Sequence, residues 1–267
     1  MKITAHHAHI FPEQSRADGT VDVLLRTMDT CGIEQCVTFA PFAKHYGDLP
    51  GTPNRFLAEA IRPNRERLFG FGVIDFEKGD LPGQVKEIRD LGFYGIKLHP
   101  AFQHFHVLGD AAEQVYDAAE KEGLFLTFHT GVHFDRIENY NILHFDEVAY
   151  RHPGLRFSME HIGGYSFFRE GLAVLTNNKK SPNGKRVFGG LTSVFDDNKP
   201  LWRLTEDEIV QAVKQAGDDT LIFGLDFPYN NAERTKADIR AAMSLPIPRE
   251  SIEKIMGGNL RRILGLE

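Results

Sequence analysis

Segments typical of β-strands and segments typical of α-helices alternate along almost the whole chain. Apolar and β-branched runs predict strands at residues 3–9, 34–40, 68–74, 94–99, 124–129, 155–161, 186–194 and 220–226. Helical periodicity predicts helices at residues 22–31, 53–62, 81–91, 111–122, 146–151, 206–216, 232–243, 249–256 and 259–264. Because alternating β and α elements require a parallel sheet with right-handed crossovers, the eight repeats predict an α/β fold, the (β/α)8 TIM barrel, with extra C-terminal helices.

The connections between these segments favour a barrel whose functional end lies at the carboxyl ends of the strands. Predicted helix-to-strand links are short and carry Gly32, Gly92 and Gly123, since glycine suits a helix C-cap. Predicted strand-to-helix links are longer, as at residues 130–145, and barrel active sites are built from such loops. No linker, low-complexity segment or change in composition divides the chain, so we expect a single domain over residues 1–267.

Composition and charge narrow the partners that this chain can have. Hydrophobic residues make up 42% and charged residues 25%, values that are ordinary for a globular protein with a large core. The net charge of −6 is spread along the chain without a basic run, which argues against nucleic acid or a membrane surface as partner. No apolar stretch has transmembrane length and no signal-peptide pattern is present, so we expect a cytoplasmic protein that acts on a small molecule. A homodimer is expected by analogy alone.

Cys31 and Cys36 are expected to be neutral thiols rather than a disulfide or a metal site.

Titratable side chains fall at the ends of the predicted strands. The first strand reads ITAHHAH, in which strict alternation places His7 and His9 on one face and His6 on the other. The ends of later strands carry Lys97, His99, His129, His161 and Asp226. Because strand ends converge at one rim of a barrel, the sequence predicts that these side chains meet in one site.

The predicted site has the composition of a metal centre. Three nitrogen ligands and one oxygen ligand suit zinc, and also manganese, iron or nickel. The candidate ligands are His7, His9, His129 and Asp226. A bound divalent cation lowers the pKa of its water toward neutrality, and Asp226 can touch the ion and take the proton from that water. His161 can polarise a substrate carbonyl or shuttle a proton. We therefore predict a divalent transition metal, zinc before manganese, with Asp226 and His161 as catalytic residues.

These motifs resemble those of the amidohydrolase superfamily, and more narrowly of its amidohydrolase-related branch, which includes aminocarboxymuconate-semialdehyde decarboxylase. The matching segments occur in the family's order and span essentially the whole chain. They are HAHIFP, GIKLHP, FHTG, EHIGG, FGLDFP and GGNLRRILGL, beginning at His7, Gly95, Phe128, Glu160, Phe223 and Gly257. The resemblance implies a TIM-barrel metal-dependent enzyme in which His161 assists substrate activation. It also implies that the metal ligands are His7, His9, His129 and Asp226.

Three positions need comment beside the family pattern. Many relatives carry an aspartate two residues before the first histidine, where this chain has Ala5, and this leaves the ligands intact. Lys97 stands where some superfamily members have a carboxylated lysine that bridges two metals, although in this branch such a lysine is often only a pocket residue. Whether the site holds one metal, or two metals bridged by a carboxylated Lys97, therefore stays open. His99 is expected either to contact substrate or to cap its strand.

The predicted strand at residues 155–161 conflicts with strict alternation. Alternation places Phe157 and Met159 with His161, and puts Glu160 on the side that faces the helices. A charged side chain is unusual on that side of a buried strand. A bulge near Met159 would resolve the conflict, and so would an outward Glu160 paired with a basic residue.

Residues in the rim loops favour a small organic substrate. The aromatic candidates, about half of which we expect only to pack loops, are Phe42, Phe102, Phe105, Tyr140, Phe145, Phe195, Trp202 and Tyr229. The basic candidates for binding a carboxylate are Lys44, Lys97, Arg136 and Arg203.

Three functions follow from this site. The predicted activity is hydrolysis of an amide, lactam or lactone carbonyl by a metal-activated water. The first alternative is non-oxidative decarboxylation of an aromatic or unsaturated acid with the same metal set, which a basic residue reaching the metal-bound carboxylate would favour. The second alternative is a non-catalytic barrel that binds a metal or a ligand.

Overall fold

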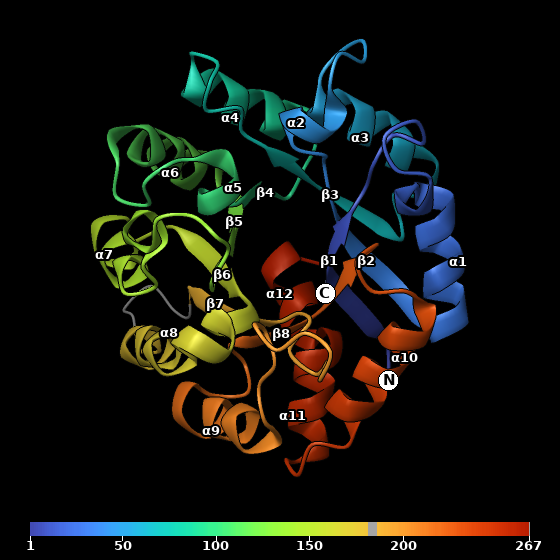
Figure 1. The fold of residues 1–267 in the computed structure, drawn as a ribbon, viewed down its shortest axis with the longest axis vertical. Coiled ribbons are helices and arrows are strands. Elements are labelled where there is room, and N and C mark those ends of the chain that lie inside the picture. Colours follow the sequence, from blue (N-terminus) through green and yellow to red (C-terminus); the bar gives the residue numbers. More distant parts are fainter. Residues whose placement is uncertain (181–185, 267) are drawn as a thin grey trace.

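The computed structural model describes residues 1–180 and 186–266, and in this part of the chain eight parallel strands close into a barrel (Figure 1). Each strand pairs with the next one in the chain, and the last pairs with the first, so the predicted (β/α)8 TIM barrel is confirmed. The strands are β1 (Ile3–His9), β2 (Ile33–Phe39), β3 (Leu68–Val73), β4 (Gly95–Leu98), β5 (Phe125–His129), β6 (Arg156–Glu160), β7 (Val187–Leu191) and β8 (Leu221–Phe227).

Helices surround the barrel, and most lie where periodicity predicts them. These are α1 (Val21–Cys31), α3 (Pro53–Ile61), α4 (Leu81–Asp90), α6 (Asp110–Glu122), α7 (His144–Arg151), α9 (Glu206–Ala216), α10 (Ala232–Met243), α11 (Arg249–Glu253) and α12 (Asn259–Leu264). The sequence analysis did not predict α2 (Ala43–Tyr46), α5 (Pro100–Gln103) or α8 (Gly164–Asn178). Single-turn elements are η1 (Ala17–Gly19), η2 (Arg62–Asn64), η3 (Ile137–Tyr140), η4 (His161–Gly163) and η5 (Lys254–Gly258).

Local signals explain where several helices begin and end. Thr205 starts α9 with a capping box, in which its side chain accepts from the Glu208 backbone N–H and the Glu208 side chain accepts from the Thr205 N–H. Gly32 and Gly123 end α1 and α6 with φ of 70° and 68°, a left-handed conformation that costs glycine little. In α8, Phe167 departs from helical geometry, with φ of −129° and ψ of 16°.

Apolar side chains fill the amino-terminal half of the barrel. Four of them stand at the first or second position of their strands and form one buried cluster: Phe69, Phe125, Phe188 and Ile222. Leu260 and Ile263 of α12 join this cluster, so α12 closes that end of the barrel (Figure 1). Because this half is packed with side chains, a site inside the barrel has room only toward the carboxyl ends of the strands.

The alternation predicted for β1 is broken by a bulge. Ala5 and Ala8, three positions apart, pair with residues of β2 that are only two positions apart. His7 accordingly has a φ of 72°, and both His6 and His7 turn into the barrel toward Glu160. The prediction that His6 lies on the opposite face from His7 is therefore wrong.

The conflict predicted for β6 has another resolution than the two expected. The strand keeps a regular register with both neighbours, so no bulge occurs at Met159. Phe157 faces the helices and packs against Phe128, with ring centroids 5.7 Å apart. Glu160 is fully buried inside the barrel rather than paired outward. His161 follows β6 with a φ of 64°. Because of this turn, His161 lies at the carboxyl-terminal mouth of the barrel although strict alternation would place it on the opposite face from Glu160.

Two smaller observations concern the thiols and the helices. Cys31 and Cys36 are free, and burial raises the pKa of the Cys36 thiol, which keeps it neutral. Within residues 1–180 and 186–266, no helix combines the length and the apolar character that crossing a membrane would require.

Candidate metal centre and active-site cavity

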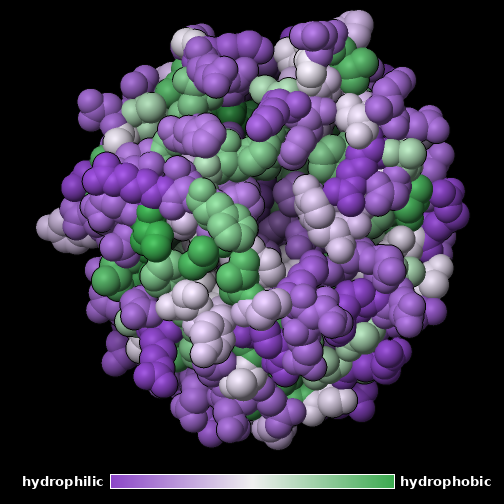
Figure 2. Space-filling model, in the orientation of Figure 1, coloured by the Kyte–Doolittle hydropathy of each residue, from purple (hydrophilic) through white to green (hydrophobic). Residues whose placement is uncertain are grey.

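A cavity of about 620 Å³ opens at the carboxyl ends of the strands. Figure 2 shows a recess near the centre of the face that is turned toward the viewer. All residues predicted from the strand ends line this cavity: His7, His9, Lys97, His99, His129, His161 and Asp226. The fold thus gathers into one place side chains that lie on five different strands or just beyond their ends.

Three of the predicted metal ligands form a close group. His7, His9 and Asp226 each offer one ligand atom, and these atoms lie within 4.8 Å of one another. His7 Nε2 lies 3.7 Å from Asp226 Oδ1, and the rings of His7 and His9 are 5.1 Å apart. Burial lowers the pKa of His7 to about 3 and lowers the pKa of His9 well below its ordinary value. Both rings are therefore neutral at pH 7 and carry a lone pair that can bind a cation.

His129 lines the same cavity but lies outside this close group. Its Nε2 is buried and has no hydrogen-bond partner among the described residues. Its ring stacks on His99, with centroids 3.9 Å apart and an interplanar angle of 10°. A buried polar atom left without a partner costs about 1–3 kcal/mol. His129 Nε2 is thus an atom that a bound cation would satisfy.

His99 lines the cavity and also caps a helix. Its Nδ1 accepts a hydrogen bond from the Phe102 backbone N–H at 3.3 Å and so begins α5. Burial lowers the pKa of His99 well below its ordinary value, which keeps the stacked pair with His129 uncharged.

The two oxygens of Asp226 have different surroundings. Ser193 donates a hydrogen bond of 2.6 Å to Oδ2, and Lys199 Nζ lies 3.5 Å from the same oxygen. Oδ1 faces His7 instead. Burial alone would raise the pKa of Asp226, but His7, His161 and Lys199 together hold it below its ordinary value. Asp226 is therefore an ionised carboxylate.

Ser193 and Lys199 are not among the site residues predicted from the sequence. Both lie in the connection between β7 and α9, and Lys199 donates to Ser193 Oγ at 3.2 Å and to Asn230 Oδ1 at 2.5 Å. No motif or spacing marks these residues. Ser193 falls within the strand predicted at residues 186–194, which ends at Leu191 in the structure, and Lys199 is marked only as one of many residues in the loop that follows.

Backbone strain gathers around the cavity. His7, His161, Ser193 and Asp226 are not glycine, yet their φ values are 72°, 64°, 57° and 59°. Such conformations cost about 1–3 kcal/mol each and persist where the surrounding structure fixes them, commonly at functional sites. Strain of this kind cannot be read from hydrophobic periodicity.

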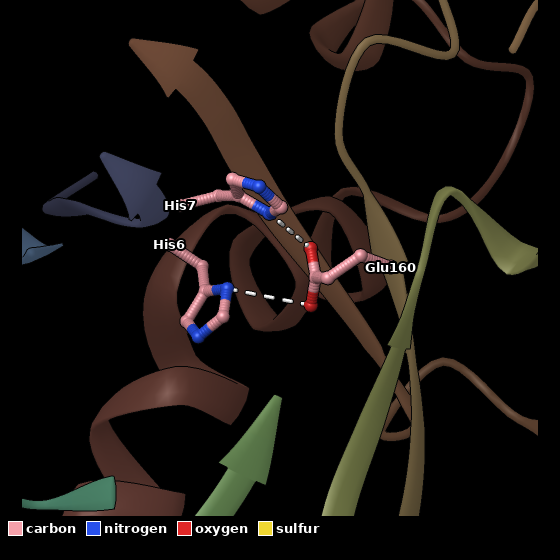
Figure 3. A group of neighbouring side chains, drawn as sticks. All are labelled: His6, His7 and Glu160. Atoms are coloured by element: carbon pink, nitrogen blue, oxygen red, sulfur yellow. Dashed lines mark hydrogen bonds and ion pairs between the residues drawn. The ribbon is translucent and has the colours of Figure 1, made fainter. Parts of the chain in front are cut away.

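A buried carboxylate approaches the centre from inside the barrel (Figure 3). Glu160 Oε2 accepts from His7 Nδ1 at 2.9 Å, and Glu160 Oε1 lies 3.3 Å from His6 Nδ1. Ser158 donates to Oε1 and Thr192 donates to Oε2, each at 2.7 Å. Burial alone would raise the pKa of Glu160, but His6 and His7 hold it well below its ordinary range. Glu160 is not among the site residues predicted from the sequence.

His161 and Lys97 complete the polar part of the cavity. His161 Nδ1 donates to the Thr192 carbonyl at 2.7 Å, and its ring stacks on Trp202 with centroids 4.7 Å apart. Lys97 Nζ lies 3.4 Å from His7 Nε2, and burial lowers the pKa of Lys97 to about 8.

The walls of the cavity carry part of the predicted rim. Four of the predicted aromatic residues line it: Phe42, Phe102, Trp202 and Tyr229. The others are buried elsewhere: Phe105, Tyr140, Phe145 and Phe195. Of the predicted basic residues Lys97 lines the cavity, whereas Lys44, Arg136 and Arg203 do not. The expectation that about half of the aromatic side chains only pack loops agrees with this division.

A second cluster of metal-ligating residue types lies outside the cavity. Ligand atoms of His106, Glu138 and His144 lie within 4.8 Å of one another. However, His106 Nδ1 accepts from the Leu108 N–H at 3.0 Å, and His144 Nε2 donates to the Glu138 carbonyl at 3.1 Å. Glu138 is also exposed, so this cluster lacks the burial of the group formed by His7, His9 and Asp226.

Comparison with known proteins gives the class that this fold and site define. The family model described as Amidohydrolase matches residues 6–266, so the chain belongs to the amidohydrolase family, whose members are metal-dependent enzymes. The resemblance stated from the motifs is thereby confirmed. No curated protein matches the chain.

Solved structures with the same fold cover nearly the whole chain. An uncharacterized TIM-barrel protein from Bordetella bronchiseptica has a TM-score of 0.78 at 20% identity, with 99% of each chain covered. A candidate 2-pyrone-4,6-dicarboxylic acid hydrolase from Pseudomonas putida has a TM-score of 0.73 at 17% identity, covering 100% of this chain and 98% of the other. A dihydroxybenzoic acid decarboxylase from Polaromonas sp. JS666, with bound manganese and the inhibitor 2-nitroresorcinol, has a TM-score of 0.71 at 16% identity, covering 99% and 97%. Similarity at this level establishes the fold and is compatible with both hydrolysis and decarboxylation.

Proposed function

We propose that this chain hydrolyses a small amide, lactam or lactone through a metal-activated water. The observation that carries the proposal is the close group of His7, His9 and Asp226 in a cavity that also holds the partnerless Nε2 of His129. Family membership supports a metal-dependent enzyme of this general class and leaves the substrate open.

The residues present fit a divalent transition metal. Neutral imidazoles of His7 and His9 and the ionised carboxylate of Asp226 are donors that zinc accepts, and His129 offers a further nitrogen. We propose zinc because a nitrogen-rich set favours it, with manganese as the alternative. The manganese bound to the Polaromonas decarboxylase supports that alternative. A cation held there would lower the pKa of a coordinated water to near neutrality and so supply a nucleophile.

The chain's own residues can then handle the proton. Asp226 turns Oδ1 toward His7, so Oδ1 is the oxygen on the side of the proposed metal ligands. Oδ2 faces Ser193 and Lys199 instead and is the oxygen proposed to accept a proton. His161 donates its Nδ1 proton to a backbone carbonyl, which leaves a lone pair on Nε2 when the ring is neutral. Of the two roles expected for His161, this arrangement supports proton shuttling over polarising a carbonyl. Trp202 covers the His161 ring and limits the access of bulk water.

Non-oxidative decarboxylation is the second candidate, and a specific observation favours it. Lys97 and Lys199 both line the cavity, so two ammonium groups can meet a carboxylate that enters it. Aromatic walls formed by Phe42, Phe102 and Trp202 suit a flat, unsaturated acid. A small organic molecule is the proposed partner in either case.

A substrate panel tests the proposal. The purified chain, loaded with Zn²⁺ or Mn²⁺ in parallel, is assayed with a lactone, an amide and aromatic carboxylic acids. Turnover of the lactone or the amide supports hydrolysis, and release of CO₂ from an acid supports decarboxylation. Tight metal binding without turnover of any substrate class would favour the non-catalytic barrel.

A further inference from the structure

Glu160 does not line the cavity and does not belong to the predicted ligand set, yet it contacts one proposed ligand directly. We infer that Glu160 is the positioning residue of the metal centre, which holds His7 with its proton on Nδ1 and its Nε2 lone pair toward the cavity. The inference rests on the metal centre proposed above and goes beyond it by assigning the residue that prepares His7 before any cation binds.

The hydrogen bond between Glu160 and His7 fixes the tautomer of the ring. Both Glu160 oxygens accept from hydroxyl donors, so the geometry assigns the proton of the 2.9 Å bond to His7 Nδ1, with Glu160 Oε2 as acceptor. A neutral imidazole has one ring proton, which leaves Nε2 with a lone pair. Nε2 faces Asp226 Oδ1 at 3.7 Å and Lys97 Nζ at 3.4 Å, on the cavity side of the ring. Carboxylate partners of this kind orient metal-binding histidines generally.

Both carboxylate oxygens of Glu160 accept a hydrogen bond from a hydroxyl group. Ser158 donates to Oε1 and Thr192 donates to Oε2, each at 2.7 Å, from β6 and from the residue after β7. The bulge in β1 points His6 and His7 into the barrel together, so that each ring meets a different oxygen of the same carboxylate (Figure 3). Because every oxygen has two polar neighbours, the carboxylate has little freedom to turn away from His7.

Two glycines leave the room that this network needs. A Cβ at Gly190 of β7 would overlap Glu160 Oε2, and a Cβ at Gly224 of β8 would overlap Thr192 Oγ1. Gly189 is the matched neighbour, since its Cβ would point the other way and meet Ile162. The absence of side chains at Gly190 and Gly224 is therefore a feature of this polar network.

The experiment compares two ways of disturbing Glu160. Glu160→Met removes both oxygens at similar length, and Gly190→Ala keeps the carboxylate but displaces it. Gly189→Ala is the control for a methyl group added to the same strand. The first readout is ¹⁵N NMR of the His7 ring in metal-free protein, and the second is Zn²⁺ affinity from competition with a chelator. We expect the Nδ1–H tautomer in the wild type and in Gly189→Ala. We expect Glu160→Met and Gly190→Ala to lose it and to bind Zn²⁺ about 10–100-fold more weakly.

The outcomes separate this inference from the proposed function. If both Glu160→Met and Gly190→Ala fold and keep the wild-type tautomer and affinity, the positioning role is overturned. If Glu160→Met does not fold, Gly190→Ala still decides, because it retains the buried charge. If the wild type binds no metal, the proposed metal centre fails, whereas the tautomer comparison still supports or overturns the action of Glu160 on His7.

Discussion

Lys199 Nζ lies 3.5 Å from Asp226 Oδ2, while its two hydrogen bonds go to neutral oxygens of Ser193 and Asn230. The same lysine lines the cavity, so it can serve either the proposed base or an incoming substrate. A substrate that carries a carboxylate would share Lys199 with Asp226, whereas a neutral lactone or amide would not. Lys199 is therefore a residue at which hydrolysis and decarboxylation can be distinguished.

Lys199→Met should lower kcat/KM for carboxylic acid substrates by about 10–100-fold, which is the effect of losing one charge-assisted hydrogen bond. Neutral substrates should lose less, since they do not need the ammonium group. Lys44→Met is the control, because Lys44 lies 5.8 Å from the centre of the Phe102 ring and does not line the cavity. Equal losses for neutral and acidic substrates would contradict a role in carboxylate binding.

The purified protein should carry about one tightly held divalent metal per chain, as one set of histidine and aspartate ligands implies. His129→Ala should weaken metal binding, because it removes the buried nitrogen that has no partner among the described residues. His133→Ala is the control, since His133 lines the same cavity without belonging to the proposed ligand set. Elemental analysis and chelator competition measure both effects. Metal-free protein that also refuses added zinc and manganese would refute the centre.

His6→Ala should keep the metal and lose stability, whereas His7→Ala should lose the metal. The His6 ring is fully buried against Phe39, with centroids 5.3 Å apart, and contacts Thr127 Oγ1 at 3.2 Å. Its removal should therefore lower the free energy of unfolding by roughly 2–4 kcal/mol. Denaturant unfolding and metal content on the same batch provide the test. Loss of metal from a folded His6→Ala variant would show that His6 belongs to the centre.

The sequence predicts elements better than it predicts the directions of side chains near the site. Periodicity identifies all eight strands, and alternation places Lys97 and His99 of the fourth strand correctly in the cavity. It also directs Asp226 away from the face that packs under the helices, as observed. The fourth strand follows alternation because its register is regular with both neighbours, whereas Asp226 reaches the cavity with a φ of 59° beside a register shift in β8.

Alternation fails where the backbone itself departs from a regular strand. The bulge in β1 depends on pairing with both neighbouring strands, and such pairing is not encoded in the run ITAHHAH alone. In β6 the buried Glu160 looks like an outward residue until His6 and His7 are known to meet it. Lys199 is not predicted for another reason, because only the closed barrel brings its loop beside Asp226.

Asp226→Asn should separate metal retention from turnover. Ser193 and Lys199 both offer hydrogen-bond donors to Oδ2, so the asparagine should turn its carbonyl oxygen toward them. The amide nitrogen then faces His7 and cannot bind a cation, so the metal should stay only through the histidines and more weakly.

Asparagine also cannot accept a proton at neutral pH, and general-base assistance is typically worth about 10²–10⁴ in rate. Turnover should therefore fall at least that far, beyond what the loss of bound metal explains. Steady-state rates and metal content are measured on one protein batch at saturating metal. Asp238→Asn is the matched control, because Asp238 is a buried aspartate that pairs with Arg234 at 2.6 Å outside the cavity. That variant should lose stability but keep both metal and activity. Near wild-type turnover of Asp226→Asn with full metal would show that Asp226 is not the base, and His161, whose Nε2 carries a lone pair when the ring is neutral, would then be the proton acceptor to test.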